Sequence, residues 1–318
     1  MRLLKFAALL AFLLAAGPAA AQPGKILRIV VPFPPGGGVD VVARKLGERL
    51  SQELDQQVIV ENRAGASGNI GADAVAKSAP DGNTLLVSAS TFVVNPLVAA
   101  QKAPFDPMKD FTHLALIAKG PVLFITHPSY GATLREFVAG AKTNPEKYNL
   151  ATGGYGSAGH LSAESFKLRA RLKIPVVLYK GTAPAFADLM GGQISGIFDP
   201  LVTALPLAKG GKVQALALAA PKRSPLAPDV PTMAEAGVPD FEFYTWYGLW
   251  GPDNLPKAAA SRIERAVAAA GKSPELSKWF EAQGLEYGKL TGKAFVEFER
   301  REQATVRDIM KRGNLKRP

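Results

Sequence analysis

Short runs of β-branched residues alternate along the chain with segments in which apolar residues recur at every third or fourth position. The clearest helical segment is VDVVARKLGERLSQEL, where Val42, Leu46, Leu50 and Leu54 share one face. Regular alternation of strands and helices is typical of parallel α/β units. Strands are predicted at residues 26–33, 56–62, 83–90, 113–119, 121–129, 149–154, 174–180, 195–199, 213–219 and 244–252. Helices are predicted at residues 39–54, 69–82, 160–170, 183–192, 257–272, 274–283 and 292–313, with a turn and a helix within 126–147.

The N-terminal segment has a pattern of its own. MRLLK is basic, FAALLAFLLAAG is apolar, and PAAAQ is a run of small residues. This order is that of a secretory signal peptide, which we predict at residues 1–21 with cleavage near Ala21. A membrane anchor would need about 18 or more apolar residues, and this apolar run is shorter. We therefore expect an exported protein.

The length of the chain and its composition favour two lobes. The 318 residues include no cysteine, so stability must come from burial rather than from disulfides. A chain this long exceeds the size at which one core usually divides. We predict lobe 1 at residues 22–122 together with 228–318, and lobe 2 at 123–227. The connections near 121–126 and 225–250 are the expected hinge.

The formal net charge of +11 suggests anionic partners. It falls by two when Arg2 and Lys5 leave with the signal peptide. The positive charges are spread along the chain, and the one basic cluster of note, KRGNLKRP, lacks interleaved aromatic residues, which argues against nucleic acid. A diffuse positive field favours the arrival of small anions.

Three glycine-rich turns each follow a predicted strand and precede a predicted helix. They read PFPPGGGVD, ENRAGASGNIG and LATGGYGSAGHLS. At such a junction the first backbone N–H groups of the helix are free and its dipole is positive, so a carboxylate or phosphate can bind without a charged side chain. An ordinary tight turn is the alternative for any one of them. A dinucleotide site is disfavoured, because none of the turns spells G-x-G-x-x-G.

Four side chains near these turns are candidates for ligand contact. Asp40 lies in the first turn of a predicted helix, where it could point away, pair with Arg44, or bind a ligand ammonium group. His160 could donate to a ligand or serve in capping or packing. Lys180 could meet an anion or lie in solvent. Asp199, at the end of a predicted strand, could orient a water or a ligand hydroxyl group, or begin a turn before Pro200.

No catalytic set or metal site is evident. Ser157 lies in Tyr155-Gly156-Ser157-Ala158-Gly159, which lacks the first glycine of the G-x-S-x-G nucleophile turn. The three histidines lack the spacing of a metal-binding helix. An exported hydrolase or isomerase that uses Asp40 or Asp199 with His160 remains the competing hypothesis. No cofactor is expected.

Several long blocks resemble one family over nearly the whole mature chain. They are PFPPGGGVDVVAR, VIVENRAGASGNIGADAVAKSAPDGNTLL, GSAGHLSAESFK, YKGTAPAFADLMGGQISGIFDP and PDVPTMAEAGVPDFE. In these blocks the chain is similar to the Bug-type periplasmic substrate-binding proteins of the tripartite tricarboxylate transporter system. The resemblance implies a two-lobed α/β fold like that of type II periplasmic binding proteins, with mainly parallel sheets flanked by helices and a ligand cleft between the lobes.

The resemblance also implies a function. A protein of this kind is not an enzyme: it binds a small carboxylate in the periplasm, acts as a monomer and delivers the ligand to membrane permease subunits. Family members accept dicarboxylates, citrate, amino acids and aromatic acids. The block NLATGGY and the proline after the acid in GIFDP depart from the family pattern and leave the ligand open. A receptor that signals to a membrane kinase is the alternative.

The resemblance implies that the ligand is held by the glycine turns and by the middle of the third strand, which contributes Ser88, Ser90 and Thr91. These positions and the four side chains above make up the candidate ligand-binding residues. The full set is Phe33, Pro35, Gly36, Gly37, Gly38, Asp40, Ala66, Ser67, Gly68, Ser88, Ser90, Thr91, Thr152, Gly153, Tyr155, Ser157, His160, Lys180 and Asp199.

Overall fold

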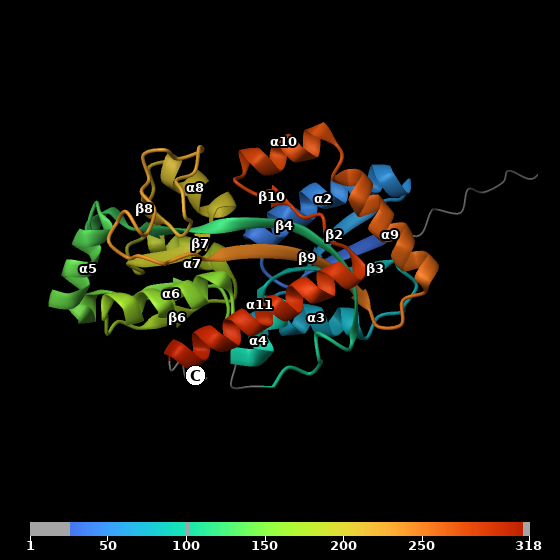
Figure 1. The fold of residues 1–318 in the computed structure, drawn as a ribbon, viewed down its shortest axis with the longest axis horizontal. Coiled ribbons are helices and arrows are strands. Elements are labelled where there is room, and N and C mark those ends of the chain that lie inside the picture. Colours follow the sequence, from blue (N-terminus) through green and yellow to red (C-terminus); the bar gives the residue numbers. More distant parts are fainter. Residues whose placement is uncertain (1–25, 99–101, 314–318) are drawn as a thin grey trace, which may run out of the picture.

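The computed structural model describes residues 26–98 and 102–313, so the predicted signal peptide lies outside the described residues. Helices and strands alternate as the apolar pattern predicts (Figure 1). Within the described ranges, no helix combines the length and the apolar character needed to cross a membrane. The strands are β1 (Leu27–Val31), β2 (Val58–Asn62), β3 (Thr84–Ala89), β4 (Phe111–Thr126), β5 (Leu150–Thr152), β6 (Val176–Leu178), β7 (Gly196–Pro200), β8 (Gln214–Leu218), β9 (Tyr244–Pro252) and β10 (Glu286–Tyr287). The α-helices are α2 (Gly38–Leu54), α3 (Asn69–Ala76), α4 (Thr91–Val98), α5 (Leu134–Thr143), α6 (Ala158–Ala170), α7 (Thr182–Met190), α8 (Leu201–Lys209), α9 (Lys257–Ala270), α10 (Pro274–Ala282) and α11 (Gly292–Gly313), with short 3₁₀ turns η1 (Ala66–Gly68), η2 (Pro128–Tyr130) and η3 (Pro145–Lys147).

The strands form one mixed sheet in the order β2-β1-β3-β9-β4-β7-β5-β6, and both β8 and β10 pair with β4. The glycine-turn units are parallel, as expected: β1 pairs with β2 and β3, and β5 pairs with β6 and β7. In contrast, β9 and β4 pair antiparallel with their neighbours. The sheet therefore consists of two parallel sets joined by two long antiparallel strands.

Strand β4 connects the two ends of the molecule. It was expected as two strands, 113–119 and 121–129, but it runs without a break past Pro121. Its first part pairs with β9, and its last five residues, from Val122 to Thr126, pair with β7 and β8. In Figure 1, β4 and β9 cross the middle of the molecule, with α5 to α8 at one end and α2, α3 and α9 at the other.

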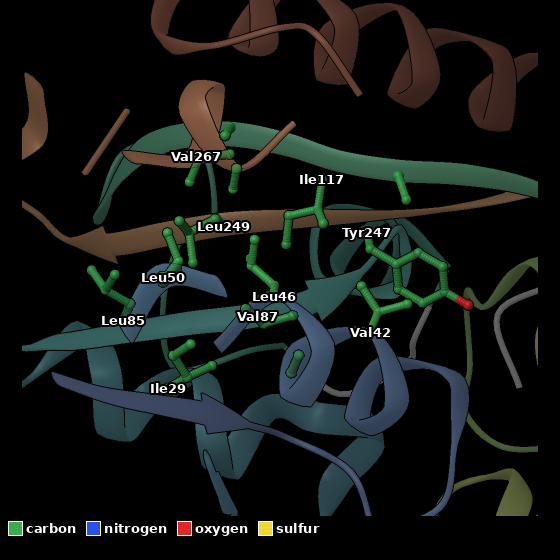
Figure 2. Close-up of a cluster of buried hydrophobic side chains, with 14 of the residues drawn as sticks. Ile29, Val42, Leu46, Leu50, Leu85, Val87, Ile117, Tyr247, Leu249 and Val267 are labelled. Carbon is green, nitrogen blue, oxygen red and sulfur yellow. The ribbon is translucent and has the colours of Figure 1, made fainter. Parts of the chain in front are cut away.

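Each end of the sheet has its own buried core. The predicted apolar face of α2 is confirmed, because Val42, Leu46 and Leu50 are fully buried between the sheet and α9. Figure 2 shows Leu46 and Leu50 near Leu249, and Val42 near Tyr247. We refer to this end as the first half. The other end, the second half, is built around an aromatic cluster of Phe124, Phe137, Phe166, Phe198 and Phe241.

Helices α4 and α8 were missed by the sequence analysis. Each contains an internal proline, Pro96 or Pro206, which removes a backbone donor and normally argues against a helix. Both helices bury most of their apolar residues, so tertiary packing overrides the local preference. Because α4 begins at Thr91, the expectation that Ser88, Ser90 and Thr91 lie in the middle of a strand is wrong: Ser88 is near the end of β3 and Ser90 follows it.

Candidate ligand-binding site

A cavity lies between the two halves, where the carboxyl ends of the parallel strands meet. Its empty volume is about 610 Å³, counting the part open to solvent. Both halves contribute to its wall, as expected for a ligand site in an open α/β sheet. The lining residues are Phe33, Pro34, Gly37, Gly38, Val39, Ala89, Thr91, Gly153, Ser157, Ala158, Gly159, Gly181, Thr182, Phe198, Asp199, Pro200, Thr245 and Tyr247.

Three helices direct their N-termini at this cavity. Helix α2 begins after Gly37 and α7 begins after Gly181, and neither N-terminus is capped by a side chain. In α6, the Ser157 hydroxyl group accepts from the His160 amide at 3.0 Å, while Ala158 and Gly159 line the cavity. The first amides of a helix lack intrahelical acceptors and carry the positive end of the dipole. The cavity is therefore suited to an anion, and the N-termini come from both halves.

The cavity wall holds no lysine, arginine or histidine among the described residues that line it. Its polar side chains are hydroxyl groups and one carboxyl group, and much of the rest is apolar, including Phe33, Val39 and Phe198. An anion bound here would be neutralised by backbone dipoles rather than by a cationic side chain.

Asp199 is the acid of the cavity, and its side chain is almost completely buried. One oxygen, Oδ2, accepts from the Thr203 hydroxyl group, while Oδ1 has no partner within hydrogen-bonding geometry among the described residues. Burial raises the pKa of the Asp199 carboxyl group to about 7, and the neighbouring hydroxyl groups of Thr203 and Thr182 act in the opposite direction. Burial therefore favours the protonated form of Asp199 far more than in an exposed carboxyl group.

Tyr247 faces the same part of the cavity from β9. Its ring packs at the edge of the first core, and its hydroxyl group points away from that core (Figure 2). Within the described part of the chain this buried hydroxyl group has no hydrogen-bond partner, and burial raises its pKa far above the ordinary value. A Cβ at position 38 would lie 2.6 Å from the Tyr247 hydroxyl oxygen, which explains why glycine is needed at Gly38.

The two halves touch each other around the cavity. Across the gap, Asn95 Nδ2 donates to the Tyr155 carbonyl oxygen at 3.0 Å, and the Tyr155 amide donates to Ser67 Oγ at 3.3 Å. Nearby, Gly181 packs so tightly on Pro34 that a Cβ would be 2.5 Å from the proline Cδ. These contacts hold the loops of one half against the loops of the other.

Comparisons with known proteins agree with this geometry. Residues 42–315 match the model of the tripartite tricarboxylate transporter family receptor. The chain belongs to this receptor family. It is 36% identical to the protein BugT of Bordetella pertussis over 264 residues, which cover 82% of this chain and 81% of BugT.

Solved structures of similar proteins show the same fold. One described as a periplasmic transporter is 37% identical with a TM-score of 0.87, covering 94% of this chain and 100% of that one. MatC from Rhodopseudomonas palustris, solved with malate, is 30% identical with a TM-score of 0.84, covering 89% and 98%. Another R. palustris protein, solved with adipate, is 32% identical with a TM-score of 0.87, covering 92% and 98%. The predicted periplasmic-binding-protein fold and the family resemblance are confirmed.

Seven of the candidate residues of this receptor line the cavity, and twelve do not. Those in the wall are Phe33, Gly37, Gly38, Thr91, Gly153, Ser157 and Asp199. Those outside it are Pro35, Gly36, Asp40, Ala66, Ser67, Gly68, Ser88, Ser90, Thr152, Tyr155, His160 and Lys180. Ser67 and Tyr155 contact each other across the halves instead, and Lys180 is exposed.

Asp40 is turned toward its own half. It accepts from the Gly36 amide at 3.0 Å, from Asn62 Nδ2 at 2.9 Å and from Arg44 Nε at 3.1 Å. Burial raises its pKa, but these partners outweigh burial and leave the pKa of the carboxyl group below its usual value. Of the alternatives left open by the sequence, the structure shows the pairing with Arg44, which braces the GGG turn.

His160 likewise supports a loop. Its Nδ1 accepts from the Gly156 amide at 3.3 Å, and its ring meets Tyr155 edge-on. Burial lowers its pKa, so the ring is held neutral. The packing role is the one that the structure shows.

Several wall residues were not predicted from the sequence, most notably Thr182, Thr245 and Tyr247. Thr182 could have been found, because LYKGTAP is a fourth junction of strand, glycine and helix. Thr245 and Tyr247 alternate on one side of β9, but nothing local in the sequence places that strand beside the glycine turns.

Proposed function

We propose that this protein is a periplasmic solute receptor that binds a small carboxylate between its two halves and delivers it to the membrane permease of a tripartite transporter. The observation that carries the proposal is the convergence of three helix N-termini, from both halves, on one cavity whose described lining has no cationic side chain. Membership of the receptor family supports it. The malate and adipate in the two R. palustris structures support a carboxylate ligand.

We further propose that the halves move as lobes joined by β4 and β9. Met233, Val238 and Phe241 pack in the second core, which favours a boundary near Tyr244 rather than at residue 228. A ligand that touches both lobes stabilises the closed arrangement by its preference for that state. The cross-contacts at Asn95 and Gly181 belong to such a closed arrangement.

The protein is proposed to bind its ligand as a monomer, without chemical change. The match to a receptor family supports binding over catalysis. His160, the base of the competing enzyme hypothesis, does not line the cavity. Mass analysis of a bound acid after prolonged incubation tests this point, because turnover would yield a product. Signalling to a membrane kinase would begin with the same ligand-binding step. It differs from transport in the membrane protein that binds the ligand-bound receptor, a kinase instead of a permease.

A thermal-shift screen tests carboxylate binding. The mature protein is heated with malate, adipate, benzoate and glutamate, each alongside its amide. An acid present at about 100 times its Kd should add about 2.7 kcal/mol to the free energy of unfolding. Loss of the shift on amidation supports an anion site, whereas no shift with any acid contradicts the proposal.

Two substitutions at Gly37, one small and one bulky, test whether the ligand lies in this cavity. Its φ is −80°, and a Cβ there would lie 3.7 Å from Thr182 Oγ1, an ordinary contact. Gly37→Ala should therefore keep most of the affinity, while Gly37→Leu should fill the cavity and abolish binding without lowering the melting temperature of the ligand-free protein. Full affinity in Gly37→Leu would place the ligand elsewhere.

A further inference from the structure

Two buried polar atoms of the cavity have no partner within hydrogen-bonding geometry among the described residues, although the hydroxyl groups of Thr182 and Thr245 lie nearby. The two atoms are Oδ1 of Asp199 and the hydroxyl oxygen of Tyr247, and both residues are only 1% exposed. Buried polar groups are almost always hydrogen-bonded, because an unpaired one has lost its water without gaining a partner. Both residues line the cavity, so a ligand there can supply the missing partners.

The surroundings of these two atoms favour an anion over a cation. Gly38, at the start of α2, sits against the Tyr247 hydroxyl group, and Thr182, at the start of α7, is a neighbour of Asp199. Both helix ends carry positive dipole charge, which stabilises a carboxylate and repels an ammonium group. A ligand carboxylate at this position would, however, also meet the carboxyl group of Asp199. Two ionised carboxylates in contact are strongly disfavoured, whereas an acid and a carboxylate form a short hydrogen bond.

We propose that the receptor binds its carboxylate together with one proton, which Asp199 holds. In the complex, the Asp199 Oδ1–H group and the Tyr247 hydroxyl group both donate to carboxylate oxygens of the ligand, and the proton comes from the solvent. This inference rests on the proposed function. It adds that Asp199 is protonated when the site holds the ligand carboxylate. Asp199 thereby replaces the cationic side chain that the described cavity wall lacks.

Among the described residues, no charged side chain shifts the pKa of Asp199, so burial and the bound ligand have the main influence on its protonation. The titratable group that faces Asp199 is Tyr247. The charged and titratable groups of the neighbouring elements are turned to other partners: Asp40 to Arg44, Glu164 to Lys167, His160 to the Gly156 amide, Asp188 to Tyr179, His113 to Glu299, and Lys119 to the ring of Tyr244.

The pH dependence of binding follows from linkage. At pH values well above 4 the ligand acids are ionised. In the ligand-free site the pKa of the Asp199 carboxyl group is about 7. Above that pH, binding of the ionised ligand therefore requires the uptake of a proton. The Kd is expected to rise about tenfold for each pH unit above about 7 and to be flat below it. An amino acid held through its ammonium group by ionised Asp199 would show the opposite sign, with proton release and tighter binding at higher pH.

The experiment is isothermal titration calorimetry between about pH 6 and about pH 9 in two buffers of different ionisation enthalpy, which counts the protons taken up. The probe is the acid among malate, adipate, benzoate and glutamate with the largest thermal shift. We expect uptake approaching one proton per ligand at the alkaline end. An invariant Kd, no uptake, or proton release overturns the inference while leaving carboxylate binding intact. If no acid binds at any pH, the proposed function itself fails.

Variants assign the effect to Asp199. Asp199→Asn keeps the shape of the side chain and supplies an N–H donor that does not titrate. The Kd of this variant should therefore not change with pH, and at alkaline pH it should be at least as low as that of the wild type. Asp188→Asn, on α7 but bonded to Tyr179, is the matched control and should keep the wild-type pH profile. A folded Asp199→Asn protein with an unchanged pH slope overturns the assignment. If Asp199→Asn does not fold, Tyr247→Phe is measured instead. It should raise the Kd at every pH and leave the dependence of the Kd on pH unchanged. An unaltered Kd would contradict the proposal that Tyr247 and Asp199 both donate to the ligand carboxylate.

Discussion

Asn95 provides a direct test of whether contact between the halves contributes to affinity. It lies in α4 and is 2% exposed. Its Nδ2 donates across the gap to the Tyr155 carbonyl oxygen at 3.0 Å, and its Oδ1 accepts from Asn69 Nδ2, within the same half, at 3.4 Å. Asn95→Ala removes both bonds, but only the first one links the two halves.

The magnitude can be worked from these contacts. A neutral hydrogen bond contributes about 0.5–1.5 kcal/mol net. The carbonyl group of Tyr155 regains water when the halves separate, so the loss of the first bond weakens closure rather than folding. A loss of about 1 kcal/mol from closure raises the Kd about fivefold. Ser67→Ala removes the longer cross-bond from the Tyr155 amide, and a smaller increase, about twofold, is expected.

Calorimetric titration with the acid found in the screen measures both variants. Asn69→Ala is the control, because it removes only the bond within the first half and should leave the Kd unchanged. Small-angle scattering should show the ligand-free Asn95→Ala protein as more expanded than the wild type. If the Kd of Asn95→Ala stays within about twofold of the wild-type value while its melting temperature falls, Asn95 acts in folding and the reasoning about closure is wrong.

Three further predictions concern stability. Phe137→Ala should lower the free energy of unfolding in urea by about 3–5 kcal/mol, because the ring is fully buried, with its centroid 5.0 Å from that of Phe124. The ligand Kd should be unchanged. A much smaller loss of stability would mean that the second core collapses to fill the space. Gly159→Ala would drive a Cβ into the carbonyl oxygen of Phe198, so both the melting temperature and the affinity should fall, and wild-type behaviour would show that α6 can shift freely. Because Asp199 binds its proton more tightly when folded than when unfolded, its stabilising contribution is complete below about pH 4 and is lost as pH rises to about 7. Relative to Asp199→Asn, the melting temperature of the ligand-free wild type should therefore decline across that interval, and parallel pH profiles would contradict the raised pKa.

The sequence predicted the features of this receptor that depend on neighbouring residues. The apolar face of α2 at Val42, Leu46 and Leu50 follows from helical periodicity, and the structure buries all three. The GGG turn before α2 and the SAGH segment before α6 are local signals of exposed helix N-termini, and both reach the cavity. Such features are readable because the hydrogen-bonding needs of a helix end are set within a few residues of it.

Other features depend on segments that are distant in the sequence. Whether 91–98 and 201–209 form helices was decided by burial against the sheet, in spite of Pro96 and Pro206. Asp40 and Asp199 are both acids beside helix N-termini, and nothing local separates them. The fold surrounds Asp40 with Arg44 and other donors, and it buries Asp199 with one oxygen unpaired.

The sequence by itself therefore determined where an anion could be held, since free amides at a helix start are a local property. Only the tertiary structure decided which side chains line the cavity and how deeply they are buried. Tyr247 lines the same cavity as Asp199, although β9 lies far from β7 in the sequence. The pKa of Asp199 is set by its burial, which is a property of all the elements packed around it.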